Sequence, residues 1–332
     1  MKNILVTGGT GFIGSHTIDA LINQGFRVRC LVRKKDNLSY IQEHVEKNKV
    51  ELAYGDITDL ESLKESVKGI DTIYHFVAIS GKQNIPEKAY WEVNYQGTLN
   101  ILEAAKTTSL ERFIHCSSVG VMGNLQKIPA DESAPYNPTN TYEKTKMEAE
   151  KAVLKMIKEE QFPAVIIRPA IVYGPRNAPS NMARMFAAIK NGTFFIIGSG
   201  NNYWHMTYVT DVAEAFLLAG TKRGIEGEIF IVAGEKPYTM NEITAQIAQE
   251  EKVPSPKHLP FLPTLIGSYF LGLAHHLFRI KVPIEPSGVY FLTNHRAYDI
   301  TKAKKILGYA PKVGLKEGIA ETVNWYAENG YL

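Results

Sequence analysis

Cysteine is scarce in this sequence of 332 residues: Cys30 and Cys116 are the two present, and both lie in short apolar runs. So few thiols argue against a disulfide framework and favour a reducing compartment. There is little excess of charge of either sign, because 37 Lys and Arg against 34 Asp and Glu give a formal net charge of +3. This balance makes nucleic acid an unlikely main partner. With 45% hydrophobic and 21% charged residues the chain is globular, and its length predicts about two domains.

The sequence also lacks a signal-peptide layout and a clean membrane span. Residues 1–6 lead directly into a strand pattern, so we expect a cytoplasmic protein. The longest apolar tract covers residues 259–280, but two prolines near its start and His275, His276 and Arg279 near its end leave too short an apolar core to cross a bilayer. We expect a helix packed into the protein or over a substrate pocket. A peripheral membrane contact is the alternative.

Short apolar runs alternate with helical patterns through the first half of the chain, which predicts a parallel sheet with helices on both faces. The strand-like runs are Ile4–Thr7, Arg27–Val32, Val50–Tyr54, Thr72–Val77, Arg112–Cys116 and Ala164–Arg168. The helical candidates are Ser15–Gln24, Leu60–Val67, Trp91–Lys106 and Tyr142–Glu159. We predict an α/β fold, a doubly wound parallel (Rossmann) sheet, with residues 1–173 as the dinucleotide-binding domain. Residues 174–332 form a smaller, interleaved substrate lobe, from which 228–232 returns to complete the sheet.

A glycine-rich segment follows the first strand-like run and opens the first helix. Gly8 permits a tight turn, Gly11 permits close approach of a pyrophosphate, and Gly14 permits close packing of helix on strand. The first helical turn, with Phe12 and Ile13, then presents free N–H groups and a positive dipole end to the anion. This pattern predicts a dinucleotide cofactor.

The end of the second strand bears on the cofactor's type. An acidic residue there would bind a ribose 2′-hydroxyl, whereas arginine would pair with a 2′-phosphate. Arg33 and Lys34 occupy this place, with no acid before Asp36, so NADP is favoured and NAD stays open. At the end of the third strand, Asp56 is a candidate to accept a hydrogen bond from the adenine amino group, or else an ordinary turn residue.

Tyr142 and Lys146 are four residues apart and share one face at a helix start. An unperturbed tyrosine has a pKa near 10, and a neighbouring ammonium or oxidised nicotinamide would lower it towards the working range of an acid–base catalyst. Ser117 and Ser118 end the fifth strand, at the edge where doubly wound sheets bind ligands.

These motifs together resemble the extended short-chain dehydrogenases/reductases, of the NAD-dependent epimerase/dehydratase superfamily, and the pattern is closest to the 3β-hydroxysteroid dehydrogenase and dihydroflavonol 4-reductase branch. The resemblance covers nearly the whole chain, in the segments 7–14, 55–56, 75–78, 94–98, 117–123, 142–146, 168–175, 208–213 and 307–311.

The resemblance implies a catalytic group of Ser118, Tyr142 and Lys146, with Ser117 as the rival for the serine. Ser118 would hydrogen-bond the substrate oxygen, Tyr142 would give or take its proton, and Lys146 would hold the nicotinamide ribose. Further cofactor contacts are implied at Ile57, Val77, Ala78, Asn94, Ser117, Pro169 and Val172. A homodimer through the helices at 91–106 and 142–159 is a further expectation from the resemblance.

Three functions compete. We favour an oxidoreductase that interconverts a ketone or aldehyde and an alcohol on a small, mainly apolar substrate. A nucleotide-sugar 4-epimerase or dehydratase with retained NAD is the alternative, and a non-catalytic cofactor sensor the minor one. A nucleotide diphosphate needs arginine, and Arg176, Arg184 and Arg296 are the candidates.

Apolar and aromatic residues dominate the expected substrate pocket. Tyr173, Trp204 and His205 are the weakly supported candidates for substrate contact. We predict no metal site, because the adjacent His275 and His276 would point about 100° apart on a helix and no further ligand lies near them in the sequence.

Overall fold

A computed structural model of the chain describes residues 3–80, 85–278 and 286–332. Its centre is a seven-stranded sheet of order β11-β6-β5-β4-β1-β2-β3, in which every pairing is parallel. The predicted doubly wound α/β fold is therefore confirmed. The strands of this sheet are β1 (Asn3–Thr7), β2 (Arg27–Val32), β3 (Val50–Tyr54), β4 (Thr72–His75), β5 (Arg112–Cys116), β6 (Ala164–Pro169) and β11 (Ile229–Val232).

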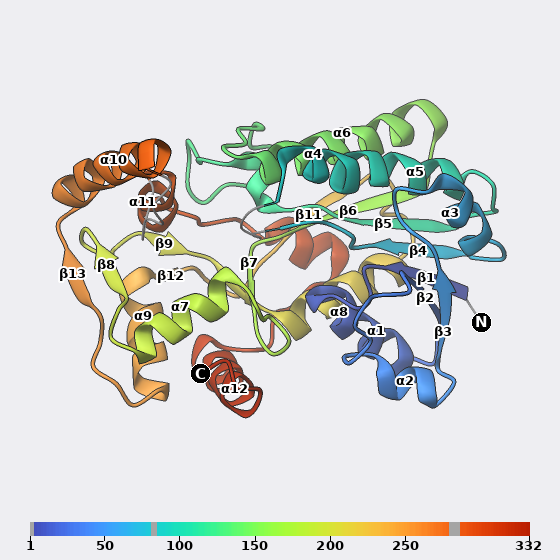
Figure 1. The fold of residues 1–332 in the computed structure, drawn as a ribbon. Coiled ribbons are helices and arrows are strands. Elements are labelled where there is room, and N and C mark those ends of the chain that lie inside the picture. The colour runs from blue at the N-terminus through green and yellow to red at the C-terminus, as the bar shows by residue number, and fades with distance from the viewer. Residues whose placement is uncertain (1–2, 81–84, 279–285) are drawn as a thin grey trace.

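Helices cover both faces of the sheet, as Figure 1 shows. On one face Ile18 and Phe216 are buried in the core, and on the other Leu63, Ile101 and Val153 are buried. These side chains belong to apolar stripes of the helices. Because such stripes cover both faces of the sheet, its strands are nearly continuous apolar runs. The helices concerned are α1 (Phe12–Asn23) and α8 (Val209–Thr221) on the first face, and α3 (Leu60–Ser66), α5 (Gly97–Ala105) and α6 (Thr141–Glu160) on the second.

The predicted helix over 91–106 is not regular. A short helix α4 (Glu87–Tyr90) leads into a π-helical turn, η1 (Trp91–Gln96), before α5 begins at Gly97. The π turn contains Asn94, whose amide bonds outside the helix as described below. Such single π turns frequently lie at functional sites.

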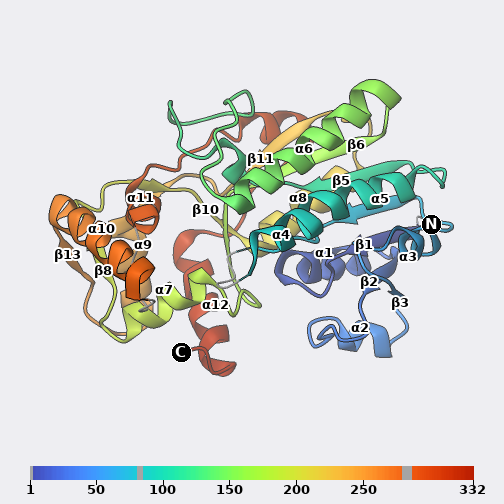
Figure 2. The ribbon, with the colours of Figure 1, turned by 45° about the horizontal axis from the view of Figure 1, so that its top comes forward.

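The substrate lobe packs beside the carboxyl ends of the central strands (Figure 2). Its own core includes Phe186, Ile243, Ile319 and Tyr326. Three two-stranded sheets, β10–β7, β12–β9 and β13–β8, connect its helices. The elements are β7 (Ile171–Tyr173), α7 (Asn181–Lys190), β8 (Phe195–Ile197), β9 (Tyr203–Trp204), β10 (Met206–Tyr208), β12 (Tyr238–Thr239), α9 (Met240–Glu250), β13 (Lys257–Leu259), α10 (Phe261–Phe278), α11 (Pro286–Thr293) and α12 (Leu315–Glu328). Short elements elsewhere are α2 (Gln42–Glu46), η2 (Val119–Met122) and η3 (Ala303–Leu307).

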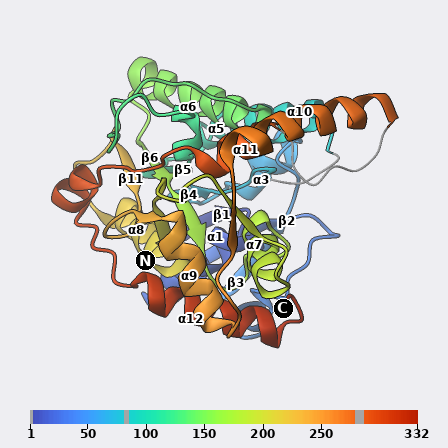
Figure 3. The same ribbon diagram turned by 90° about the vertical axis from the view of Figure 1, so that its left-hand side faces the viewer.

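The described half of the apolar tract at 259–280 is largely exposed, and the packing of the rest lies outside the described residues. It forms α10, which extends from the outer end of the lobe in Figure 3, and its side chains are described as far as Leu271. Leu262, Ile266 and Phe270 are more than half exposed. In the described part of the chain, no helix has both the length and the hydropathy to cross a membrane.

Candidate active site

The glycine segment after β1 is built for close contact. Gly8 has φ of +72°, and a Cβ on it would lie 2.8 Å from the backbone nitrogen of Val77, just beyond β4. A Cβ on Gly14 would lie 2.3 Å from the carbonyl oxygen of Gly8. Sequence reasoning missed Gly9, where a Cβ would lie 2.6 Å from the Sγ atom of Cys30. Any side chain at these positions would push the turn away from the strand ends.

The N-terminus of α1 is open to a ligand. Gly11 is the N-cap and supplies no side-chain hydrogen bond to the first turn, which begins with Phe12 and Ile13. The first N–H groups of the helix are thus left for an anion, with the positive end of the helix dipole behind them. These residues fit the pyrophosphate of a dinucleotide, since the turn has room for no side chain and the helix end needs acceptors.

The ends of β2 and β3 hold charged side chains that are already paired. The guanidinium of Arg33 donates to the carboxylate of Asp36 from Nε at 3.0 Å and from Nη2 at 2.8 Å. Asp56 accepts from the backbone N–H of Thr58 at 2.9 Å and from its hydroxyl at 2.8 Å. Burial opposes ionisation of Asp56, but these hydrogen bonds, with Arg33 and Lys35 nearby, hold its pKa below the usual value.

Polar side chains tie the end of β4 to the helices above it. The Oγ1 atom of Thr7 lies 2.8 Å from Nδ1 of His75, whose Nε2 lies 3.0 Å from the hydroxyl of Thr98. Burial lowers the pKa of His75 to about 3, so its ring is neutral.

Asn94 has a positioning role in this structure. Its amide oxygen accepts from the N–H of Ile79 at 2.7 Å, and its amide nitrogen donates to Thr145 on α6 at 3.0 Å. It therefore fixes the segment after β4, which contains Val77 and Ala78, against the helix that carries Tyr142. Ile57 is buried against Gly97, where a Cβ would lie 2.8 Å from its side chain.

Tyr142 and Ser118 come together at the end of β5. Asn140 caps α6 by accepting from the N–H of Glu143 at 2.9 Å, which places Tyr142 in the first turn of the helix. Its phenol lies close enough to Ser118 for the serine hydroxyl to affect the pKa of the phenol, and the Oγ atom of Ser118 accepts from the N–H of Gly120 at 3.0 Å. Burial raises the pKa of Tyr142 above its usual value, and the hydroxyl of Ser118 opposes this rise.

Lys146 lies one turn further along α6 and is 2% exposed. Its ammonium donates to the carbonyl oxygen of Cys116, the last residue of β5. Burial lowers the pKa of Lys146, although Cys116 and Glu150 oppose the shift. The expected lowering of the Tyr142 pKa by this ammonium is not found in the protein alone, because burial of the phenol dominates.

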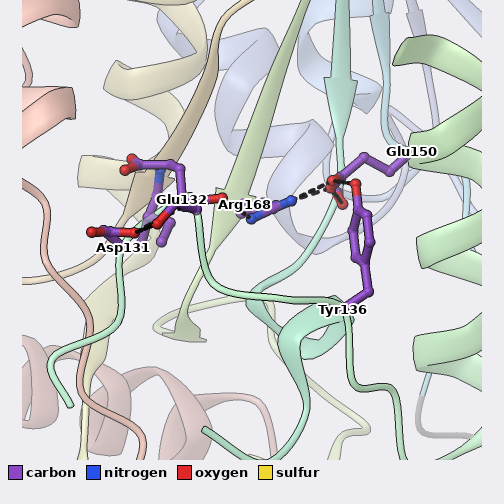
Figure 4. Close-up of polar contacts among 8 residues, drawn as sticks. Asp131, Glu132, Tyr136, Glu150 and Arg168 are labelled. Carbon is purple, nitrogen blue, oxygen red and sulfur yellow. Dashed lines mark hydrogen bonds and ion pairs between the residues drawn. The ribbon is translucent and has the colours of Figure 1, made fainter. Parts of the chain in front are cut away.

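Ser117 belongs to a buried ionic network, drawn in Figure 4. Its hydroxyl donates to the carboxylate of Glu150, which also pairs with the guanidinium of Arg168 and accepts from the hydroxyl of Tyr136 at 2.7 Å. Arg168 further donates to the carbonyl oxygen of Glu132 at 3.1 Å. With its hydroxyl held there, Ser117 is less free than Ser118 to bind a substrate oxygen, and Ser118 stays the predicted catalytic serine. Breaking the buried pair would cost about 3–5 kcal/mol.

Pro169 ends β6 and Val172 lies in β7, so both follow the central strands towards the lobe. Two of the expected substrate residues prove to be packing residues. Tyr173 is 2% exposed, and its ring packs against Tyr208 at 5.5 Å. His205 is 1% exposed, and its two ring nitrogens lie 2.9 Å from the carbonyl oxygen of Gly234 and 3.3 Å from the N–H of Tyr298. Both side chains are packed inside the fold, and substrate contact stays a prediction for them, as it does for Trp204.

Trp204 is 3% exposed, and its Nε1 has no hydrogen-bond partner. An isolated parallel β-bridge pairs the backbone of Arg296 with that of Trp204, and Arg296 is 9% exposed. The Nε atom of Arg296 is likewise unpartnered, and its guanidinium packs over the ring of Phe291 at 4.2 Å. Burial raises the pKa of Tyr298 to about 12, and the charge of Arg296 opposes this rise.

The other two candidate arginines differ from Arg296. Arg176 pairs with Asp19 at 2.8 Å, and Arg184 is exposed and bonds to Asn181. Of the three, Arg296 alone is both buried and without an ion pair among the residues that the structure describes. An unpaired buried cation with a neighbouring orphan donor suits an anionic or acceptor-rich ligand.

Within residues 3–80, 85–278 and 286–332, no cluster of three or more His, Cys, Asp or Glu could hold a metal ion. The side chains of His275 and His276 lie outside the described residues.

Comparisons with known proteins agree with this geometry. The model of the NAD dependent epimerase/dehydratase family matches residues 4–233. An uncharacterised protein of Sinorhizobium fredii is 34% identical, over 98% of this chain and 96% of that protein. The decarboxylating sterol-4-alpha-carboxylate 3-dehydrogenase of Candida albicans is 28% identical, over 99% of each. The structure of UDP-glucuronic acid 4-epimerase from Bacillus cereus in complex with NAD is 26% identical, with a TM-score of 0.79 over 98% of this chain and 99% of that one.

Proposed function

This chain belongs to the NAD dependent epimerase/dehydratase family, and on that premise we propose that it interconverts an alcohol and a ketone or aldehyde by hydride transfer. The observation that carries the proposal is the meeting of Ser118, Tyr142 and Lys146 at the end of β5. This edge lies next to the glycine cradle, because β1 and β5 flank β4 in the sheet. The chain is thereby an enzyme of the short-chain dehydrogenase/reductase type.

The chain's own residues bind, orient and move a proton. The hydroxyl of Ser118 would hydrogen-bond the reacting oxygen of the substrate, and the Oη atom of Tyr142 would donate or accept its proton. Lys146 would hold the cofactor ribose from the side of β5. When bound, the nicotinamide cofactor supplies or accepts the hydride.

Arg296 and Trp204 support a substrate with an anionic group. The Nε1 atom of Trp204 and the Nε atom of Arg296 are buried donors without acceptors among the described residues, although the side chain of Arg296 also interacts with Tyr298. A carboxylate or phosphate would pair the guanidinium of Arg296 while the apolar neighbours Phe291 and Trp204 contact the rest of the molecule. The expected mainly apolar substrate is thus refined to one that also bears an anion.

Arg296 also favours the second candidate function, a nucleotide-sugar 4-epimerase or dehydratase with retained NAD. Arginine suits a diphosphate, and the likeness to the Bacillus cereus epimerase points the same way. The two functions differ in whether reducing equivalents leave the protein.

We further propose NAD(H) in place of the NADP that the sequence favoured. The guanidinium of Arg33 is already neutralised by Asp36, so a 2′-phosphate would have to displace this carboxylate. A ribose 2′-hydroxyl needs no such exchange.

One experiment separates the two functions. The purified protein is examined by native and by denaturing mass spectrometry, then assayed with NAD(H) and NADP(H) against panels of hydroxy acids, keto acids and UDP-sugars. Exchangeable cofactor and stoichiometric NADH formation or consumption would support the oxidoreductase. A non-exchanging NAD, with UDP-sugars converted and no net NADH change, would show the epimerase or dehydratase instead.

A further inference from the structure

Helix α10 turns its apolar side to the solvent. Leu262, Ile266, Tyr269 and Phe270 are 65%, 55%, 57% and 70% exposed. Their spacing of three and four residues places them on one stripe of the helix. Ser268 lies on the opposite side and is 1% exposed, with its hydroxyl bonded back to the carbonyl oxygen of Leu265 at 2.7 Å. The described part of α10 therefore presents large apolar side chains to the solvent.

Helix α12, in another part of the lobe, shows the ordinary arrangement. In α12, Leu315, Ile319 and Tyr326 are buried at helical spacing, and the remaining positions carry most of the charge. Burying a large apolar side chain contributes about 1.5–3 kcal/mol. The apolar stripe of α12 is thus part of the lobe's own core, whereas the apolar stripe of α10 is not.

The charge around α10 is of one sign. Between Glu251 and Glu285 the sequence has no acidic residue, while it has Lys252, Lys257, Arg279 and Lys281. Lys257 is exposed on β13, directly before α10 begins. Basic residues beside an apolar stripe are the pattern of helices that lie in the headgroup region of anionic bilayers.

The position of α10 leaves this surface accessible. Figures 1 and 2 both place it at the outer end of the lobe, away from the seven-stranded sheet. It packs on α11, where the rings of Phe261 and Tyr290 lie 6.5 Å apart. The next residue of α11, Phe291, contacts both Trp204 and Arg296. The exposed stripe is therefore one helix away from the unpaired donors.

We propose that α10 docks on the surface of an anionic lipid bilayer, with Leu262, Ile266, Tyr269 and Phe270 inserted at the headgroup boundary. The helix lies in the interface and does not cross it, in keeping with the finding on membrane spans. A second copy of the chain fits less well, because two such surfaces face to face would bring like charges together with no acid to compensate. This docking goes beyond the proposed function and does not depend on it.

The test is flotation with vesicles. Protein is mixed with vesicles of phosphatidylcholine alone, or with 30 mol% phosphatidylglycerol (roughly the range in which surface charge matters), and the floating fraction is measured at low and high salt. We expect binding to the anionic vesicles, weakened by salt, and at least about tenfold weaker binding to neutral ones. Equal absence of binding to both would overturn the proposal.

Variants locate the contact. The double variant Leu262→Gln with Phe270→Glu should lower partitioning onto anionic vesicles by more than about tenfold, since it removes two inserted side chains. Its thermal unfolding midpoint should stay within about 1 °C, because both positions face solvent. Ile306→Glu is the matched control: Ile306 is 41% exposed, lies outside α10, and should leave vesicle binding unchanged. Equal loss in the control would contradict the assignment. A different result would also contradict it: the parent binds no vesicles, and the double variant has half the parent's mass by light scattering. That result would indicate that a second copy of the chain covers α10.

Discussion

The dinucleotide-binding sheet and the substrate lobe treat buried charge differently. In the sheet region Arg168 pairs with Glu150 and Arg112 with Glu226. In the lobe, Arg296 and Glu251 are buried or half-buried without an ion pair among the described residues. A buried charge is stable only when it is paired or when it gains a partner on binding. The two arginines of the sheet region thus have their ionic partners within the fold, and we expect Arg296 to gain one on binding.

The same contrast holds for apolar surface. The helices on the sheet bury their stripes against buried strands, while α10 leaves its stripe exposed. We therefore expect the lobe to determine substrate specificity and membrane docking. Hydride and proton transfer should depend on the residues at the sheet edge. The predictions below test this division.

The largest effect is expected at the sheet edge. Tyr142→Phe removes the proton donor and should lower kcat by about 10³-fold, with cofactor affinity unchanged within a few-fold. Stopped-flow turnover and a cofactor titration by fluorescence measure the two quantities. A loss of affinity with retained turnover would mean that Tyr142 serves binding only.

The pH profile of the parent enzyme checks the same residue. Burial raises the pKa of Tyr142, so the phenol is protonated at neutral pH and ready to donate. The rate of reduction should therefore be nearly independent of pH from 6 to 8. The rate of oxidation should rise about tenfold per pH unit until the phenol is ionised in the complex with cofactor. A profile of the opposite sign would contradict the proton transfer.

The next effect is expected in the lobe. Arg296→Met should raise KM by about 10- to 100-fold for an anionic substrate, because a charged hydrogen-bond donor is lost, and leave kcat nearly unchanged. It should also raise the midpoint of thermal unfolding, since an unpaired buried charge is replaced by an apolar side chain of similar length. Arg184→Met, at an exposed arginine, is the control. A destabilised variant with unchanged KM would make Arg296 a structural residue of the lobe.

The sequence specified the sheet better than the lobe, and for a physical reason. The bounds of β2, β3 and β5 were predicted to the residue, because parallel strands buried on both faces are continuous apolar runs. The π turn at 91–96 was missed, since its apolar spacing differs little from that of an α-helix. In the lobe, the sequence could not show that Tyr173, His205 and Arg296 are buried. Their direction depends on short strand pairs between distant segments.

For the site, glycine and catalytic motifs predicted the residues but not their partners. Ser118 and Ser117 are neighbours, and only the position of Glu150 on α6 separates their roles. Similarly, Arg33 predicted binding of a 2′-phosphate, but the sequence did not show that its guanidinium donates to the carboxylate of Asp36.

A smaller effect is expected at the cofactor ribose, on the sheet side of the comparison. Asp36→Asn releases the guanidinium of Arg33 and should shift the ratio of NADP to NAD affinity by about tenfold towards NADP. Isothermal titration with both cofactors gives the ratio. Arg33→Ala alone should change the NAD affinity by no more than a few-fold. Should both substitutions leave the ratio unchanged, the ribose is bound elsewhere.

The smallest effect is expected at Glu251, at the end of α9 in the lobe. Burial raises its pKa to about 7, and both carboxylate oxygens lack a hydrogen-bond partner. The folded chain holds this proton more tightly than the unfolded chain does. The contribution of Glu251 to the free energy of unfolding should therefore be greatest below pH 4.5 and should be lost as the pH rises through 7. Glu251→Gln should remove the loss, raising the free energy of unfolding at pH 8 by about 1 kcal/mol after solvent screening, or about 2 °C in Tm, with no gain at pH 5. Equal gains at both pH values would show that packing, not an unpaired charge, distinguishes this end of the lobe from the sheet.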